Sequence, residues 1–313
     1  MTVTRLWERQ AEEKLVWVDV VDPQSDDIAW LERTFAFHPM ALQDVMRRHQ
    51  RAKINEYPGY YFGVLYVARI DARRRRTSTS ELQFFWGPTY LVTIHSEPLP
   101  EIDDLATRVR SGAVTPVVNA ANRQLEIADI VYHLLDGIVD GYFPAVDAIA
   151  DWTDDIEEHM FSGSSRPETL QTIFALRKNL IQLRKVVAPS RDALNSLLRR
   201  DRALYGEEFY PYFQDVYDHT VRVIDSLDTY RDLLGSALDT YLSLISNDVS
   251  QTVKKMTAVT AILMVTALIA GIYGMNFEVM PELHWMFGYP YALGLMLGAA
   301  IALWLLFRRI RWL

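Results

Sequence analysis

The sequence predicts an α+β domain, arranged as an α/β/α sandwich around a mostly antiparallel sheet, followed by a very long stalk helix and a hairpin of two membrane-spanning helices. Three observations lead to this fold class. β-rich runs are concentrated between residues 15 and 95, no proline occurs between Pro211 and Pro281, and two charge-free apolar runs lie near the C-terminus. The chain has 313 residues. This length suffices for a domain of about 200–250 residues in addition to the hairpin.

The N-terminal part is expected to alternate strands and short helices. Its expected elements are a strand over 15–21, a helix over about 25–35, a short helix that starts at Pro39, and β-rich runs over 53–70 and 81–95. The arginine run Arg73–Arg76 and the Thr/Ser stretch after it are interpreted as a solvated connector rather than a phosphate or lipid site. Gly87-Pro88 marks a further turn. The polar residues 1–13 predict no cleavable signal peptide.

The middle of the chain has a helical pattern. Apolar residues at three-to-four spacing predict a helix over about 127–139, with a kink at Pro144. Another helix is expected over 168–187, ending before Pro189, and a further one over 192–200. The segment also carries an acidic face, made of Asp147, Asp151, Asp154, Asp155, Glu157 and Glu158. Two interpretations of this face stay open, an ordinary exposed surface and a surface that attracts cations.

From Pro211 onward the sequence predicts one helix of about 60 residues that continues into the first membrane span. Pro211 suits the first turn of a helix, and apolar residues then recur with a period near 3.5. Such a helix is on the order of 90 Å long. Because an isolated helix of this kind is unstable, we expect it to pack against copies of itself.

Two uncharged runs predict the membrane hairpin. Neither 256–275 nor 288–307 contains Asp, Glu, Lys, Arg or His. About 20 residues at 1.5 Å each cross a hydrocarbon core of roughly 30 Å. The alternative, a pair of buried core helices in a soluble domain, is disfavoured because long core helices usually carry a polar stripe. Aromatic residues lie near the ends of the second run, as in an interfacial belt.

Charges at the ends of the two runs predict the orientation. The flanking basic residues are Lys254, Lys255, Arg308, Arg309 and Arg311. Because positive clusters stay on the cytoplasmic side, we expect a multi-pass protein of the cell membrane with both termini in the cytoplasm. The outer connector carries Glu278 and Glu282 but no Lys or Arg. These acids are either an acidic mouth for arriving cations or a solvated loop.

Composition excludes several classes of protein. The net charge is -8 and the pI is about 5.4, which argues against nucleic acid as a partner. The absence of cysteine rules out disulfides, thiolate zinc sites and cysteine nucleophiles. The sequence has no phosphate-binding loop, no dinucleotide fingerprint and no His-Glu-x-x-His motif, so we expect no enzyme and no use of ATP.

Helical spacing back from Asn276 predicts an uncharged face on the first span. Its members are Ala267, Met264, Thr260, Met256 or Thr257, Val253, and Asn247 or Ser250, with Gly271 near its outer end. A hydrated dication does not bind tightly to such a face and therefore does not stall there, while the Met and Val positions suit a gate that closes by dewetting. Asp239 lies further down the same face, where it attracts an exiting ion or is an ordinary solvated residue. Lipid contact or packing between helices is the alternative for each position.

The outer end of this face suits a cation that keeps its water. The Asn276 amide offers a carbonyl acceptor without charge, and glycines at 271 and 274 let the backbone approach and bend. Mg2+ dehydrates reluctantly, so a ring of such amides and of Gly274 carbonyls fits it. Since two helices have no interior, a conduction path needs several copies around an axis.

These motifs resemble the signature of the CorA family of divalent-cation channels. The resemblance is carried by Tyr273-Gly274-Met275-Asn276, by Met280-Pro281-Glu282-Leu283, by Gly288-Tyr289-Pro290 and by the basic C-terminus. The segment from Tyr212 to Thr220 is similar to the family's stalk helix. The resemblance implies a homopentameric magnesium channel that also passes cobalt, with a cytoplasmic funnel and with Tyr273 and Met275 at the pore entrance beside Gly274 and Asn276.

The resemblance also implies a regulatory metal site. The segment from His38 to Asp44 is similar to a family segment whose final aspartate helps to bind Mg2+ between subunits, and the partner acid matches Asp215. A dication between two carboxylates reverses the sign of their interaction, so cytoplasmic Mg2+ would hold the ring closed. Gln43 stands where many family members have an acid, which puts a second adjacent site in question.

Three functions remain open from the sequence. The first is passive influx of Mg2+ and Co2+, the second a zinc transporter of the related ZntB type, and the third a membrane-anchored scaffold or sensor that conducts nothing. The predicted divisions are an α/β domain over 1–120, a helical segment over 121–205, a stalk over 209–255, spans over 256–275 and 288–307, an outer connector over 276–287 and a basic tail over 308–313.

Overall fold

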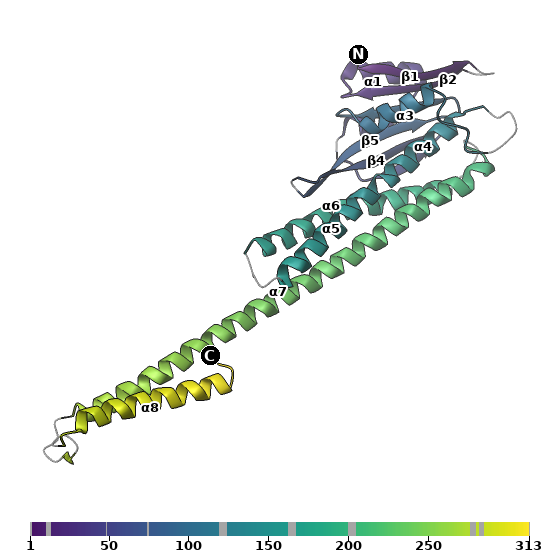
Figure 1. The fold of residues 1–313 in the computed structure, drawn as a ribbon. Coiled ribbons are helices and arrows are strands. Elements are labelled where there is room, and N and C mark those ends of the chain that lie inside the picture. The colour runs from purple at the N-terminus through teal and green to yellow at the C-terminus, as the bar shows by residue number, and fades with distance from the viewer. Residues whose placement is uncertain are drawn as a thin grey trace. The chain divides into compact units, whose positions relative to one another are not determined.

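The fold is described from a computed structural model of the chain. The structure describes residues 2–10, 14–47, 49–73, 75–118, 124–161, 167–199, 205–275, 280–281 and 285–312. The chain divides into two compact units, Met1–Ala237 and Leu238–Leu313. Unit 1 holds the sheet and most of the helices, and unit 2 consists of the end of one long helix and a second apolar helix (Figure 1).

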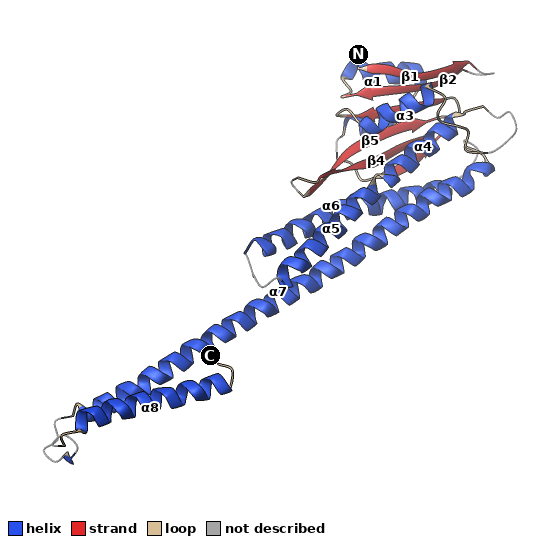
Figure 2. Cartoon of the chain, in the orientation of Figure 1, coloured by secondary structure: helices blue, strands red, loops and turns tan. Residues whose placement is uncertain are grey.

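A six-stranded mixed sheet forms the centre of unit 1 (Figure 2). Its strands are β1 (Val3–Gln10), β2 (Lys14–Val21), β3 (Lys53–Tyr57), β4 (Tyr60–Asp71), β5 (Arg76–Trp86) and β6 (Tyr90–His95). The spatial order is β1-β2-β6-β5-β4-β3. Only the β2–β6 pair is parallel among the described strands, so the predicted mostly antiparallel sheet is confirmed.

Most of β4 and the second half of β5, two neighbouring strands, are buried on both faces because helices cover the sheet on each side. Gly63 in β4 lies opposite Phe84 in β5, and a Cβ on Gly63 would lie 2.1 Å from the Phe84 ring. The missing side chain therefore makes room for the aromatic ring in the core. On the other face of the same strands, Phe37 stacks on Phe85 with ring centroids 3.8 Å apart.

Helices on both faces complete the predicted α/β/α sandwich. Helices α1 (Ser25–Phe35) and α2 (Pro39–Met46) lie over the face that carries Phe85, because the loop between them supplies Phe37. The opposite face carries Trp86, which packs on Phe213 at the start of the long helix. Helices α3 (Pro100–Arg110) and α4 (Ile127–Asp140) pack together on this side, next to α5 (Tyr142–Phe161) and α6 (Pro167–Leu198).

Two proline predictions are wrong. Pro144 does not kink a helix, because α4 ends at Asp140 and Pro144 lies in the first turn of α5, where no intrahelical N–H bond is lost. Pro189 does not end a helix either, since α6 continues through it to Leu198. Buried Val187 and Leu194 on both sides of Pro189 keep the helix against the core, and this packing outweighs the roughly 3 kcal/mol that an internal proline costs.

The sheet also differs in detail from the prediction. The run over 53–70 is not continuous, because Gly59 at φ 84° turns it into the β3–β4 hairpin. The Thr/Ser stretch after Arg76 is not a connector but the first half of β5, paired with β4. Strand β1 and helix α3 were not predicted at all.

The long helix α7 (Tyr210–Tyr273) has 64 residues, which confirms the prediction of one helix of about 60. Its first turns are buried in unit 1 through Phe213, Val216 and Thr220. Further along, Arg184 of α6 holds α7 with two hydrogen bonds to Asp228, at 2.8 and 3.2 Å.

Unit 2 contains the C-terminal part of α7 and helix α8 (Gly288–Arg309). These are the two helices of the described chain that are long and apolar enough to cross a membrane. The C-terminal end of α7 and both ends of α8 lie within two residues of the predicted span limits, whereas the predicted start of the first span falls inside the continuous helix α7. Within the two apolar spans as described, Ala258 of α7 and Ala292 of α8 are buried, with 0% and 7% of their surface exposed.

Candidate functional site

The predicted ion-path face lies along the uncovered side of α7. All eight predicted positions are exposed in the single chain, namely Asp239, Asn247, Val253, Met256, Thr260, Met264, Ala267 and Gly271. The exposed fractions of Val253, Met256 and Met264 are 56%, 66% and 64%, against 0% for Ala258 on the other side of the helix. Val259, Leu263 and Leu268 of the same span are also exposed, so this exposure is compatible with contact to lipid, to other copies or to a water-filled path.

A shallow hollow in this face has walls of apolar and hydroxyl side chains. It is lined by Val253, Met256, Thr257, Thr260, Ala261 and Met264. The Thr257 hydroxyl donates to the carbonyl of Val253 at 2.8 Å. Within the described residues the Thr260 hydroxyl makes no such bond, so it is free to bond water. The hollow therefore offers a weakly polar, uncharged wall.

The helix loosens where the outer entrance was predicted. After Tyr273, the Gly274 N–H is shared between the carbonyls of Ala270 and Gly271, at 2.9 and 3.2 Å. A Cβ on Gly274 would lie 3.2 Å from the Ala270 carbonyl oxygen, so a side chain would crowd this turn. Met275 follows and is exposed. The remaining predicted entrance residues, Asn276, Glu278 and Glu282, lie outside the described residues.

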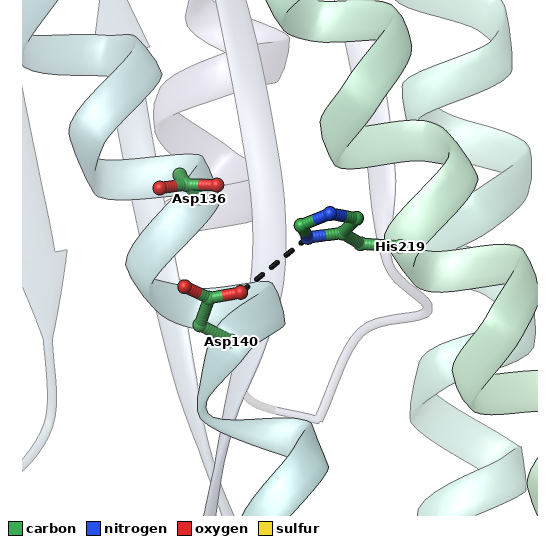
Figure 3. A group of neighbouring side chains, drawn as sticks. All are labelled: Asp136, Asp140 and His219. Atoms are coloured by element: carbon green, nitrogen blue, oxygen red, sulfur yellow. Dashed lines mark ion pairs between the residues drawn. The ribbon is translucent and has the colours of Figure 1, made fainter.

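A second group of polar side chains joins α4 to α7 in unit 1. Asp136, Asp140 and His219 each place one possible ligand atom within 4.8 Å of the others. The two aspartates are one helical turn apart on α4 and face His219 on α7, as Figure 3 shows. His219 lies 3.5 Å from Asp140 through Nδ1 and 3.5 Å from Asp215 through Nε2. We call Asp136, Asp140, Asp215 and His219 the α4–α7 cluster.

The α4–α7 cluster is strongly negative for its degree of burial. Burial and the nearby carboxylate of Asp140 raise the pKa of Asp136 to about 6. Burial, followed by the charges of Asp136 and Asp215, likewise raises the pKa of Tyr132 to about 12. Crowded carboxylates and an imidazole are ligands that a divalent cation accepts, and a bound cation would relieve this repulsion.

Sequence reasoning found only Asp215 of the α4–α7 cluster. The other members carried a weak signal, since Asp136 and Asp140 are spaced by four residues on a helix that is otherwise apolar on its inner side. Two acids at that spacing on such a helix require a partner from another element. Which element supplies it depends on the tertiary packing of α4 against α7.

The predicted regulatory pair, Asp44 and Asp215, is not brought together within one chain. Asp44 lies on α2 and pairs with Lys53 at 2.5 Å, on the face of the sheet that carries Phe85. Asp215 lies on α7, whose start packs on the opposite face through Phe213. One chain therefore cannot hold an ion between these two acids. A shared ion between neighbouring copies stays a prediction.

The chain is similar to known metal-ion transporters over most of its length. A family model described as CorA-like Mg2+ transporter protein matches residues 12–309. The cobalt/magnesium transport protein CorA of Thermotoga maritima is 33% identical over 299 residues, which cover 95% of this chain and 83% of that protein. A putative metal ion transporter of Bacillus subtilis, YfjQ, is 33% identical over 301 residues, covering 95% and 89%.

Solved structures show the same fold. The complete CorA magnesium transporter of Methanocaldococcus jannaschii superposes with a TM-score of 0.81 at 27% identity, covering 96% of this chain and 92% of that one. The cytoplasmic domain of ZntB from Vibrio parahaemolyticus gives a TM-score of 0.59 at 11% identity, covering 74% and 88%. At that identity the second likeness concerns the fold alone.

Proposed function

Because this chain belongs to the CorA-like Mg2+ transporter family, we propose that it is a passive channel for Mg2+, and also for Co2+, that works as a homopentamer in the cell membrane. The observation that carries the proposal is the continuous uncharged face of α7, exposed from Asn247 to Gly271. Copies of this face around an axis make a path that a hydrated dication crosses without binding tightly. Rings of Val253 and Met256 close it when they lose their water.

The outer entrance is built from the loosened end of α7. Five Asn276 carboxamides and the Gly274 carbonyls accept hydrogen bonds from the waters around an arriving Mg2+, which therefore keeps its inner shell. Glu278 and Glu282 raise the local cation concentration at this mouth. The Thr260 hydroxyl, which forms no hydrogen bond to the backbone among the described residues, offers a further contact for water inside the path.

The membrane potential drives the ion inward. The basic residues before the first span and after the second place both termini in the cytoplasm and the connector outside. One elementary charge gains about 2.3 kcal/mol per 100 mV, so a dication gains about 4.6 kcal/mol without any nucleotide.

Cytoplasmic Mg2+ closes the channel by binding between subunits. Asp44 of one copy and Asp215 of its neighbour supply carboxylates, and the α4–α7 cluster surrounds Asp215 with further acids. A dication at this point replaces repulsion by attraction and stabilises the closed ring, so loss of cytoplasmic Mg2+ loosens it. Lys53 competes with the ion for Asp44.

Flux into liposomes tests the proposal. Purified wild type is expected to carry Mg2+ and Co2+ when the interior is made negative, and Asn276→Ala is expected to lose most of the Mg2+ flux. Asp192→Ala, a change at an exposed acid far along the chain on α6, is the matched control and should conduct normally. Zn2+ flux that follows a proton gradient would assign the chain to the ZntB type instead, and no flux of any ion would support a non-conducting scaffold.

A further inference from the structure

Helix α8 carries a line of exposed side chains that ends in a positive charge. Its members follow one another at steps of four, three and four residues, which places them on one side of the helix; they are Leu297, Ile301, Trp304 and Arg308. The three apolar side chains are 64%, 49% and 43% exposed, and Arg308 is exposed as well. We call these four residues the α8 line. The described part of the chain leaves this side of α8 uncovered.

The α8 line is about as long as one leaflet of a membrane is thick. Arg308 follows Leu297 by 11 residues, so the line spans roughly 16 Å along the helix. Half of a hydrocarbon core of roughly 30 Å is about 15 Å. An acyl chain that lies along Leu297 and Ile301 therefore ends near the height of the Arg308 guanidinium. Trp304 comes just before that height, where indole rings collect at a membrane surface.

The Arg308 guanidinium has no counter-ion in the described part of the chain. Its Cζ atom lies 5.2 Å from the centroid of the Trp304 ring, a cation–π contact that orients the guanidinium along the α8 line. The last turn of α8 closes on itself, since the Trp312 N–H donates to the Phe307 carbonyl at 2.9 Å. The N–H groups of the guanidinium therefore remain available to an anion from outside the chain.

A second copy of the chain supplies no counter-ion at this height. Neither 256–275 nor 288–307 contains an acid, and the charged residues that border the two runs on the same side are all basic, namely Lys254, Lys255, Arg309 and Arg311. Asp248, the nearest acid before the first run, precedes Lys254 by six residues, which is roughly 9 Å along the helix. Symmetric copies present the same charges at the same height, so they repel one another there.

We propose that the α8 line binds one anionic phospholipid, with the phosphate on Arg308 and an acyl chain along Leu297 and Ile301. A guanidinium binds a phosphate through two parallel N–H donors, and the lipid brings the negative charge that the protein lacks at this height. A soluble phosphate would use the guanidinium alone and leave the apolar part of the α8 line uncovered. The inference rests on the proposed place of the chain in the cell membrane, where anionic lipids of the cytoplasmic leaflet attract basic residues.

Lipid titration of the full-length protein in detergent tests the site. Phosphatidylglycerol and phosphatidylcholine with the same acyl chains are added, and bound lipid is counted by native mass spectrometry. Arg308→Gln is expected to weaken phosphatidylglycerol binding about tenfold and to leave phosphatidylcholine binding unchanged, because a charge-assisted contact to the anionic lipid is lost. Arg309→Gln removes the same charge about 100° around the helix and is the matched control, with an expected change of less than about twofold. Equal losses in the two variants, or no preference of the wild type for phosphatidylglycerol, would overturn the proposal.

Fluorescence quenching gives the second measurement. Phosphatidylglycerol with brominated acyl chains is expected to quench part of the tryptophan emission, and Trp304→Phe should lack that part. Quenching that is the same in both proteins would refute the placement of the acyl chain, and release of the lipid by millimolar inorganic phosphate would assign the guanidinium to a soluble anion instead.

Native mass and liposome flux on the same samples separate this inference from the proposed function. An assembled, conducting protein without a preference for phosphatidylglycerol refutes the lipid site alone. A monomer that carries no ion refutes the proposed function, whatever its affinity for lipid.

Discussion

Replacing His95 by leucine is expected to destabilise unit 1 strongly, because the change leaves a buried carboxylate without its counter-ion. His95 Nε2 lies 3.0 and 3.2 Å from the two carboxylate oxygens of Asp19, and its Nδ1 lies 2.7 Å from the carbonyl oxygen of Glu97. The side chains of His95 and Asp19 are only 2% and 6% exposed. After the change, the Thr93 hydroxyl is the one remaining donor to the Asp19 side chain within the described part of the chain.

The size of the effect follows from this burial. Removing one member of a buried ion pair costs about 3–5 kcal/mol. For a unit of this size each kcal/mol lowers the melting temperature by about 2–4 °C, so the expected drop is roughly 6–20 °C. Removing both charges, in Asp19→Leu with His95→Leu, is expected to recover most of the loss because no unpaired charge remains.

The same pair predicts a pH dependence. Burial alone would lower the pKa of His95, but the hydrogen bond with Asp19 and the charge of that carboxylate outweigh burial and raise the pKa. Asp103 adds to this rise from α3. A raised histidine pKa gives stability that is complete below the unfolded value of about 6.5 and is lost as the pH rises through the folded value.

Thermal melts of the full-length protein in detergent measure both effects. Tryptophan fluorescence is a suitable signal, since the Trp17 indole donates to Thr93 at 3.1 Å beside the pair. The melting temperature of the wild type should fall as the pH rises above about 6.5. The double variant, Asp19→Leu with His95→Leu, should lack this part of the pH dependence of the melting temperature. A His95→Leu protein that melts with the wild type, or a double variant as unstable as the single one, would refute the reasoning.

Three further predictions concern the metal sites and the core. Asp136→Asn removes a crowded carboxylate, so it should raise the melting temperature in EDTA and reduce the further rise that Mg2+ produces; an unchanged Mg2+ increment contradicts the role of the α4–α7 cluster. Lys53→Met frees the Asp44 carboxylate, so cytoplasmic Mg2+ should suppress liposome flux at a roughly two- to fivefold lower concentration than in the wild type. Equal inhibition of the two proteins would contradict Mg2+ binding by Asp44. Gly63→Ala should cost about 1–3 kcal/mol in melts because its Cβ meets the Phe84 ring, whereas Gly137→Ala meets nothing within 4 Å and should not destabilise the protein.

The membrane-facing half of the protein was predictable from sequence because its signals are local. A charge-free run of about 20 residues is long enough by itself to define a span, and α8 begins at Gly288 as expected. The long helix α7 was equally clear, since no proline interrupts its apolar period. The positions that helical spacing gave are exposed on α7, and their place on an ion path stays a prediction.

The elements at the edges of the sheet were harder to predict because their structure depends on contacts with residues far away in the chain. Strand β1 buries only Leu6 and carries three charged side chains, Arg5, Glu8 and Arg9, which is typical of an edge strand and hides its alternation. Helix α3, in contrast, was overlooked despite a usable signal, with Pro100 at its start and buried Ile102, Leu105 and Val109 at helical spacing.

The residues of the candidate site also differ in whether sequence alone could predict them. The predicted pore entrance is one contiguous motif that can be identified from sequence and stays a prediction, whereas the α4–α7 cluster joins Asp140 to His219 across a long stretch of chain. At Pro189 the prediction failed for another reason. Proline usually ends a helix, but the packing of α6, which cannot be read from the sequence, keeps the helix continuous through this residue.

Among the described strands, the single parallel pairing, β2 with β6, has a consequence for how the polypeptide is made. Strands β3 to β6 follow one another in the chain, so each can pair with the previous one soon after it emerges from the ribosome. Strand β2 can pair with β6 only after Tyr90–His95 has been synthesised. Until then the β1–β2 hairpin has an unpaired border that is open to wrong partners. The nascent chain is therefore most vulnerable in its first hundred or so residues, well before any apolar segment reaches the insertion machinery.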